Sequence, residues 1–453
     1  MMSLCASFAI VKVGMIGLDT RSYTMKNLMF AATALLTAFG VSAEEWQFFS
    51  AKAAPAAATG EAGSDGSVDI RLPSNYAVGW WIRKFPCERG KAMRFRAEAE
   101  TVLTSGECAG NDVSFCVNWL APRSRYEFQT DYLNPVENFC GGKTTYRFDE
   151  TICVPSNCTE VTIQPVMRWR AGRTVFKNFS VETVAIPPPR IARVAITNPR
   201  RGRKFISIES RLQQVEAALT NLFANVAHPD IVLACSEVFA ESLAPCTVAE
   251  PADSGPTFQL LSRYAARYNC WMAGGLREVT KDGLTYNSAV LVDRKGRFVG
   301  TYRKTHLTYG EILDGTMPGD SYPVFETDFG KVGFLICWDN FFPEAIRQLH
   351  LNGAELVLYP IAATSQDRID KVFATRSYDT GLPIAVAIRQ GPRPSRIIGH
   401  DTSTLAEVTE ENGFCYADID LSHRDRVKWL SVNGMGAAYQ LYRAERRPST
   451  YTK

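Results

Sequence analysis

Histidine is scarce in this chain, with 5 residues among 453, and no two of them have the spacing of a metal-binding pair. Zinc enzymes usually hold the metal with histidines or cysteines at short, fixed spacings, so a zinc enzyme has poor support. The chain also lacks a strong charge of either sign, because its formal net charge is +3. The densest basic run, at 200–204, is typical of a solvated loop, and we expect no nucleic-acid partner.

Long apolar runs are missing as well. The longest near the N-terminus, 28–39, is too short for a confident membrane span. It follows Lys26 and precedes Val41-Ser42-Ala43, which together have the pattern of a signal peptide. We therefore predict an N-terminal extension and signal peptide over 1–43, with its apolar region at about 28–40, and export to the periplasm or outside the cell after cleavage near Ala43. An uncleaved anchor is the alternative, and residues 1–24 suggest an over-extended start codon.

A chain of 453 residues is too long for one ordinary core, and its 46% hydrophobic and 21% charged residues are typical of a globular protein. Export changes how its cysteines are interpreted, because an oxidising compartment favours disulfides. Six cysteines fall in the first half of the mature chain: Cys87, Cys108, Cys116, Cys140, Cys153 and Cys158. They suggest disulfides of unknown connectivity. The second half has an odd number, so a thiol is expected there, with Cys337 as the candidate.

Residues 44–186 are predicted to form an all-β sandwich domain. Apolar and polar residues alternate over 91–100, 113–119, 159–170 and 174–184, as half-buried strands require. The pattern resembles the jelly-roll domains of carbohydrate-binding modules, which implies a possible glycan or peptide ligand. An aromatic platform for a sugar could come from Trp80, Trp81, Trp119 and Trp169. Tryptophan is more often core, and the alternation assigns Trp119 to the buried face.

A proline-rich linker at 187–190 separates this domain from a second domain at 191–431 and a C-terminal tail at 432–453. In the second domain strands alternate with helices, which predicts an α/β fold. An amphipathic helix is expected over 207–227, where apolar residues recur at helical spacing, and a further helix over 257–268. Strands are expected at 191–197, 230–235, 270–273, 286–292, 298–302, 322–325, 332–336, 355–359 and 383–388.

Cys337 ends the apolar run 332–336 and is followed by a helix predicted from Glu344. A cysteine on the tight turn between a strand and a helix is held rigidly, and unpaired helix N–H groups would favour a thiolate and an oxyanion. Glu237 and Lys304 also follow apolar strands, where sites are commonly built. A carboxylate, an ammonium and a thiol form a workable catalytic set, although each alone could be an ordinary buried or solvated group.

These residues stand in blocks that resemble the nitrilase superfamily of carbon–nitrogen hydrolases: 302–307, 332–339 with 342–344, and 353–360. The resemblance implies a four-layer αββα sandwich that pairs into a homodimer or higher homo-oligomer. It implies Glu237 as general base, Lys304 as stabilising cation, Cys337 as nucleophile and Glu311 as an additional orienting glutamate. The backbone N–H of Trp338 would complete the oxyanion hole. The substrate would be a small-molecule amide, cleaved through a thioester with neither metal nor organic cofactor.

The residues Cys337-Trp338-Asp339 look more like the amidase and carbamoylase members than the true nitrilases. Arg368, Arg389, Arg393 and Arg396 could receive a substrate carboxylate, but exposed loop arginines are the commoner case. An N-acyltransferase would share the intermediate, and a catalytically silent binding protein is a further alternative. His306 and His400 with Asp401 suggest a cysteine protease, but a structural hydrogen bond is the favoured role for His306.

Overall fold

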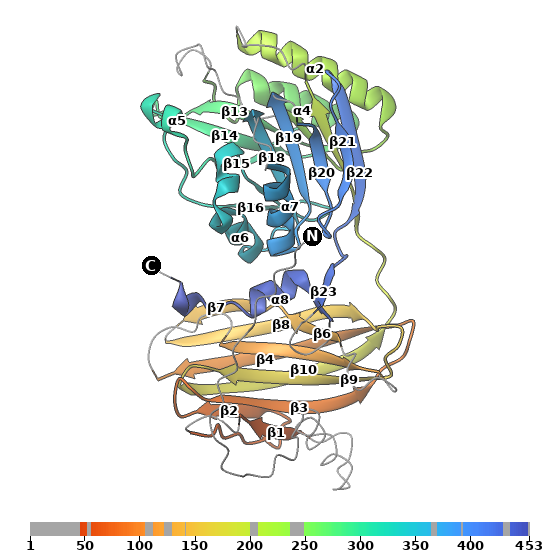
Figure 1. Ribbon diagram of the computed structural model, residues 1–453, viewed down its shortest axis with the longest axis vertical. Helices are drawn as coiled ribbons and strands as arrows, with labels where there is room; N and C mark the ends of the chain where they lie inside the picture. The colour runs from red at the N-terminus through yellow and green to blue at the C-terminus, as the bar shows by residue number, and fades with distance from the viewer. Residues whose placement is uncertain are drawn as a thin grey trace, which may run out of the picture. The chain divides into compact units, whose positions relative to one another are not determined.

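The alternating segments of the first half form antiparallel strands in two sheets (Figure 1). The computed structural model describes residues 46–51, 56–104, 112–121, 129–140, 142–199, 207–235, 249–363, 369–390, 393–428 and 435–451. The five-stranded sheet has the order β2-β10-β4-β8-β7. Its strands are β2 (Val68–Leu72), β4 (Ala92–Leu103), β7 (Val136–Cys140), β8 (Lys143–Cys153) and β10 (Gly172–Val184).

The seven-stranded sheet has the order β1-β3-β9-β5-β6-β24-β23. Its strands are β1 (Gln47–Ser50), β3 (Val78–Pro86), β5 (Val113–Leu120), β6 (Gln129–Leu133), β9 (Glu160–Arg168), β23 (Arg426–Lys428) and β24 (Met435–Ala437). The two sheets share one apolar core, to which Phe95 of β4 and Trp119 of β5 both contribute. The predicted alternating strands are thus confirmed, whereas the jelly-roll resemblance remains a prediction.

The tryptophans of this region divide between core and partial exposure. Trp81 and Trp119 are buried, and the indole Nε1 of Trp119 donates to Asp131 at 2.8 Å. The assignment of Trp119 to the core is therefore confirmed. Trp80 is half-buried and stacks on Phe49.

No disulfide joins the described cysteines of this region. Cys87, Cys116, Cys140, Cys153 and Cys158 are all thiols in the structure, in contrast to the disulfides expected from export. Cys108 lies outside the described residues.

The second half builds two six-stranded sheets with helices on their outer faces. The first sheet has the order β15-β14-β13-β12-β11-β22 and the second β16-β17-β18-β19-β20-β21. The first comprises β11 (Ile191–Asn198), β12 (Ile231–Cys235), β13 (Trp271–Val279), β14 (Thr285–Val292), β15 (Phe298–Arg303) and β22 (Gly413–Asp420). The second comprises β16 (Val324–Glu326), β17 (Lys331–Phe334), β18 (Leu356–Ala363), β19 (Ile384–Gln390), β20 (Ser395–Ile398) and β21 (Thr404–Val408).

Three apolar clusters hold these layers together. One lies between the two sheets and includes Leu233 of β12 and Leu358 of β18. A second packs α2 (Ile208–Asn225) and α4 (Pro256–Tyr268) on the first sheet. A third packs α6 (Pro343–Leu351) and α7 (Ile369–Thr380) on the second. This order confirms the expected αββα sandwich and the helices predicted at 207–227 and 257–268.

The C-terminal segment joins the N-terminal strands instead of extending the α/β sheets. Strand β24 pairs in parallel with β6, so that Met435 is opposite Gln129, and β23 pairs with β24. Helix α8 (Ala438–Ala444) then contacts α7, and His350 of α6 hydrogen-bonds the carbonyl of Tyr439 at 2.8 Å. A short helix, η2 (Pro448–Thr450), follows. Among the residues that the structure describes, no helix is both long and apolar enough to cross a membrane.

Candidate active site

Cys337 lies on a sharp turn at the end of a buried strand. Strand β17 runs in parallel beside β18, and after two further buried residues the chain enters η1 (Cys337–Phe341), a 3₁₀ helix. Cys337 has a φ of 43°, a left-handed conformation that is uncommon for a residue with a side chain. Its carbonyl accepts a hydrogen bond from the Tyr359 hydroxyl of β18. The strained turn is thus anchored to the neighbouring strand and leaves the thiol half-buried.

The turn differs from the prediction in one respect. We expected a strand through Ile336 and then a helix starting at Glu344, whose N–H groups the thiol would face. Strand β17 ends at Phe334, and η1 intervenes before α6 begins at Pro343. The expectation was wrong on this point because Cys337 is itself the first residue of a helical turn.

Asp339, two residues after Cys337, connects this turn to the block that carries Lys304. Its side chain is fully buried, and its Oδ2 accepts from the backbone N–H of Ile336 at 2.9 Å and from the Tyr302 hydroxyl at 2.7 Å. Its Oδ1 accepts from the backbone N–H of His306 at 3.0 Å and lies 2.9 Å from that residue's Nδ1. One carboxylate therefore fixes the end of β15 against the turn of Cys337.

Lys304 and Glu311 form a buried ion pair. Their side chains are 1% and 0% exposed, and the lysine Nζ lies 2.8 and 3.0 Å from the two carboxylate oxygens. Glu311 also accepts from the Asn287 amide at 2.7 Å and from the backbone N–H of Thr308 at 2.7 Å. Thr308 caps the short helix α5 (Tyr309–Leu313) that carries Glu311.

The environment of Glu311 favours its charged form. Burial alone would raise the pKa of Glu311, but the Lys304 charge and the hydrogen bonds from Asn287, Lys304 and Thr308 hold that pKa below its ordinary value. The ammonium of Lys304 is consequently paired with a carboxylate and held at a fixed position. A cation held in this way needs little reorganisation to stabilise a developing negative charge.

The remaining predicted site residues have different outcomes. Glu237 and Arg368 lie outside the described residues, and the strand that precedes Glu237, β12, contacts β18 and β19 of the facing sheet. Trp338 is 37% exposed, and its ring packs against Phe341 with centroids 4.6 Å apart. Among the described residues, no cluster of three or more histidine, cysteine, aspartate or glutamate side chains is arranged to hold a metal ion.

The arginines are less exposed than expected for loop residues. Arg389 is 4% exposed, and both Arg393 and Arg396 contact Asp370, at 2.9 and 3.2 Å. The interpretation as surface arginines was therefore wrong for Arg389, which lies at the end of the central strand β19.

The histidines of the protease alternative have structural contacts. His306 stacks on Phe342 with ring centroids 3.9 Å apart and bonds to Asp339. The two ring nitrogens of His400 lie 2.9 and 3.2 Å from the carbonyls of Gly381 and Asp420. The structural role favoured for His306 is confirmed.

Sequence comparison decides the family. The pattern of the family described as carbon–nitrogen hydrolase matches residues 199–428. The chain belongs to the carbon–nitrogen hydrolase family. This hydrolase is 32% identical over 221 residues to a probable nitrilase of Schizosaccharomyces pombe. The aligned region covers 46% of this chain and 77% of that protein. It is 34% identical over 146 residues to the N-carbamoylputrescine amidase of Arabidopsis thaliana. The aligned region covers 28% of this chain and 49% of the amidase.

Among solved structures, an amidase from Nesterenkonia has a TM-score of 0.46 and 20% identity, over 57% of this chain and 97% of that one. The sequence relatives and the family match identify an enzyme that hydrolyses carbon–nitrogen bonds other than peptide bonds.

Two contributors to the site were missed by sequence reasoning. Asn287 is a β14 residue without any local motif, and only the strand pairing brings it to Glu311. Asp339 stood within the quoted motif, but its contacts join residues that are more than 30 positions apart. A usable signal existed for Glu311, because Thr308-x-x-Glu311 has the pattern of a capping box.

Proposed function

We propose that this hydrolase is an exported amidase that cleaves a non-peptide or terminal amide, or a carbamoyl carbon–nitrogen bond, through an acyl-enzyme on Cys337. The observation that supports it most is the combination of the strained turn at Cys337 with the buried Lys304–Glu311 pair. Asp339 connects the two. The relative named N-carbamoylputrescine amidase favours carbamoyl amines among the possible substrates.

The proposed reaction has two steps. In the first, the Cys337 sulfur attacks the carbonyl carbon while Glu237 takes the thiol proton and passes it to the departing amine or ammonia, which leaves a thioester. In the second, water activated by Glu237 attacks the thioester, so that the acid is released and the thiol restored. Lys304 and the Trp338 N–H stabilise the oxyanion of both steps, and Glu311 keeps Lys304 in place.

Export is part of the proposal and rests on the signal-peptide pattern before Ala43. Pairing of two or more copies, and a glycan or peptide ligand on the N-terminal strands, are proposed from resemblance alone.

An N-acyltransferase remains the second candidate because the first step is the same. Transfer to an amine in place of water depends on what enters after the first product leaves. Adding hydroxylamine or a primary amine during turnover separates the two, since a transferase forms the amide product in preference to the acid.

The test is turnover of the mature protein on a panel of short-chain amides, N-carbamoyl amines and peptide amides, measured as ammonia release. We expect turnover of at least one class, lost in Cys337→Ala and retained in Cys140→Ala, whose thiol is exposed. Equal turnover in Cys337→Ala would overturn the proposal.

A further inference from the structure

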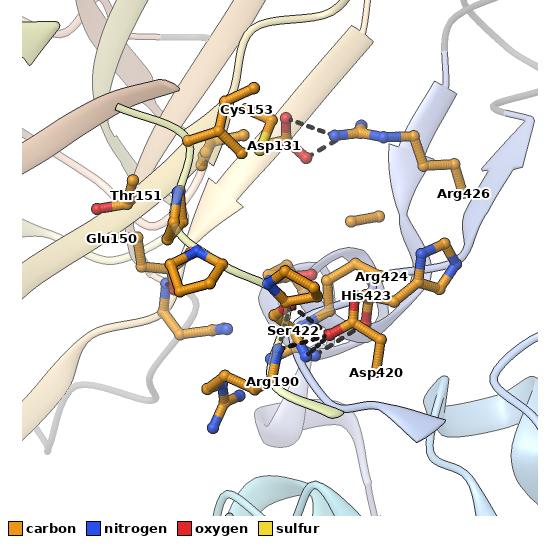
Figure 2. A pocket seen from close by; sticks show the side chains of 18 of the residues that line it. Asp131, Glu150, Thr151, Cys153, Arg190, Asp420, Ser422, His423, Arg424 and Arg426 are labelled. Atoms are coloured by element: carbon orange, nitrogen blue, oxygen red, sulfur yellow. Dashed lines mark hydrogen bonds and ion pairs between the residues drawn. The ribbon is translucent and has the colours of Figure 1, made fainter. Parts of the chain in front are cut away.

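The chain contains a cavity of about 710 Å³, and Figure 2 shows side chains that line it. Its lining comes from strand β8, from Ile186 and the linker at 187–190, from the segment after β22 and from helix α8. Cys337, Lys304 and Glu311 are not among its lining residues. The cavity is therefore separate from the proposed catalytic residues.

The positive side chains of this cavity have carboxylate partners. Arg426 contacts both oxygens of Asp131 at 3.1 Å, as Figure 2 shows. Arg190 pairs with Glu355, and Arg424 lies 3.7 Å from the same carboxylate. An anionic ligand would have to compete with these carboxylates.

Glu150 has no such partner. This half-buried carboxylate, on β8, accepts one hydrogen bond, from the backbone N–H of Asn134 at 2.8 Å. No side-chain cation in the described part of the chain forms an ion pair with it. Burial raises the pKa of Glu150 to about 7, against the opposing effects of the Asn134 N–H and the charges of Arg424 and Arg443. The carboxyl group lacks a positive neighbour in contact.

Gln440 of α8 provides a second, independent observation. Its side chain is 8% exposed and lines the cavity, and its buried Oε1 has no hydrogen-bond partner among the described residues. A buried amide oxygen without a donor is costly and is rare in folded proteins. Glu150 and Gln440 both line this cavity, and both have unused capacity to accept hydrogen bonds.

We propose that this cavity binds a small organic ammonium ion, a primary amine whose N–H groups donate to the Glu150 carboxylate and to the Gln440 Oε1. An ammonium group carries three donors and a compact charge, which matches one carboxylate and one amide oxygen. The apolar stem of the amine would lie against Ile186 and the linker prolines that line the same cavity. The bound amine would connect β8 to α8.

The test is calorimetric titration of the mature Cys337→Ala protein with 1,4-diaminobutane and n-butylamine, and with succinate as the anionic counterpart. This background cannot turn over an amide, so the result does not depend on the proposed catalytic function. We expect both amines to bind. The affinity for n-butylamine should fall at least tenfold after Glu150→Gln and several-fold after Gln440→Leu. Glu88→Gln, at an exposed glutamate, should leave binding unchanged.

Folding of the variants is checked by thermal melting at pH 8. Because the Glu150 pKa is raised in the folded state, its contribution to stability is present at low pH and lost as the pH rises through about 7. Glu150→Gln should therefore melt at or above the temperature of the parent at pH 8. The proposal is overturned if neither amine binds, if amine affinity survives Glu150→Gln, or if succinate binds in preference to the amines.

Discussion

Asp339 should control both the stability of the hydrolase and the position of its thiol. In Asp339→Ala, two buried donors, the backbone N–H of Ile336 and the hydroxyl of Tyr302, lose this acceptor, and so does the half-buried N–H of His306. Each unpaired buried donor costs about 1–3 kcal/mol, so we expect the free energy of unfolding to fall by about 2–6 kcal/mol. Asp339→Asn keeps one carbonyl oxygen and should lose about half as much.

The substitution should also lower the rate, because Cys337 occupies a strained conformation that its surroundings must hold. Holding a left-handed residue of this kind costs about 1–3 kcal/mol. If the turn relaxes, the sulfur moves, and a displacement of about 1 Å lowers the rate about 10²-fold. We therefore expect kcat of Asp339→Asn to fall about 10²-fold, with a much smaller change in KM.

Urea unfolding, steady-state kinetics and the alkylation rate of Cys337 by iodoacetamide measure the three effects. The matched control is Asp401→Asn, at an exposed aspartate whose Oδ1 accepts from Ser403. Surface changes of this kind usually alter stability by less than about 0.5 kcal/mol. Wild-type stability and kcat in Asp339→Asn would contradict this role for Asp339.

Three further predictions concern the thiol, the ion pair and a buried histidine. Cys337→Ala should lower kcat by about 10⁴-fold or more, with folding kept, as seen by circular dichroism; a residual rate near wild type would contradict the assignment. Glu311→Gln leaves the Lys304 charge buried and should cost about 3–5 kcal/mol in urea unfolding, whereas a cost below about 1 kcal/mol would show that the pair is not critical. His350 donates from Nε2 to the Tyr439 carbonyl and accepts at Nδ1 from Arg347, so it is neutral, and burial lowers its pKa to about 3. In the unfolded chain His350 takes up a proton below about pH 6.5, whereas in the folded chain it stays neutral. The free energy of unfolding should therefore have its full value above that pH and be lower by about 2 kcal/mol at pH 5. Chemical unfolding at pH 8 and pH 5 measures this difference, and an equal slope in His350→Gln would exclude His350 as its source.

Local patterns predicted most of the α/β region because its strands are short apolar runs bounded by turns. The segments that became β14 and β15 were found in this way, from a hairpin turn at 293–296. Helix α2 was predicted from apolar residues at helical spacing, and Ser207 caps it with its side chain. In these segments the local signal and the tertiary packing agree.

Long-range pairing was beyond local patterns. Residues 435–437 form a strand of only three residues, which pairs with β23 and also with β6, some 300 positions earlier. Arg389 looked like a loop residue but lies at the end of a central strand, where burial is set by the surrounding sheet. The contacts of Asp339 likewise depend on the pairing of distant segments.

The proposed mechanism requires a covalent intermediate at Cys337, which mass spectrometry can detect. The protein is mixed with the substrate panel, quenched in acid during turnover and mapped by peptide mass. We predict an adduct on the peptide that contains Cys337, with the mass of the acyl or carbamoyl part of the substrate. Continued turnover with no adduct on Cys337, or an adduct on another cysteine, would contradict the proposed mechanism.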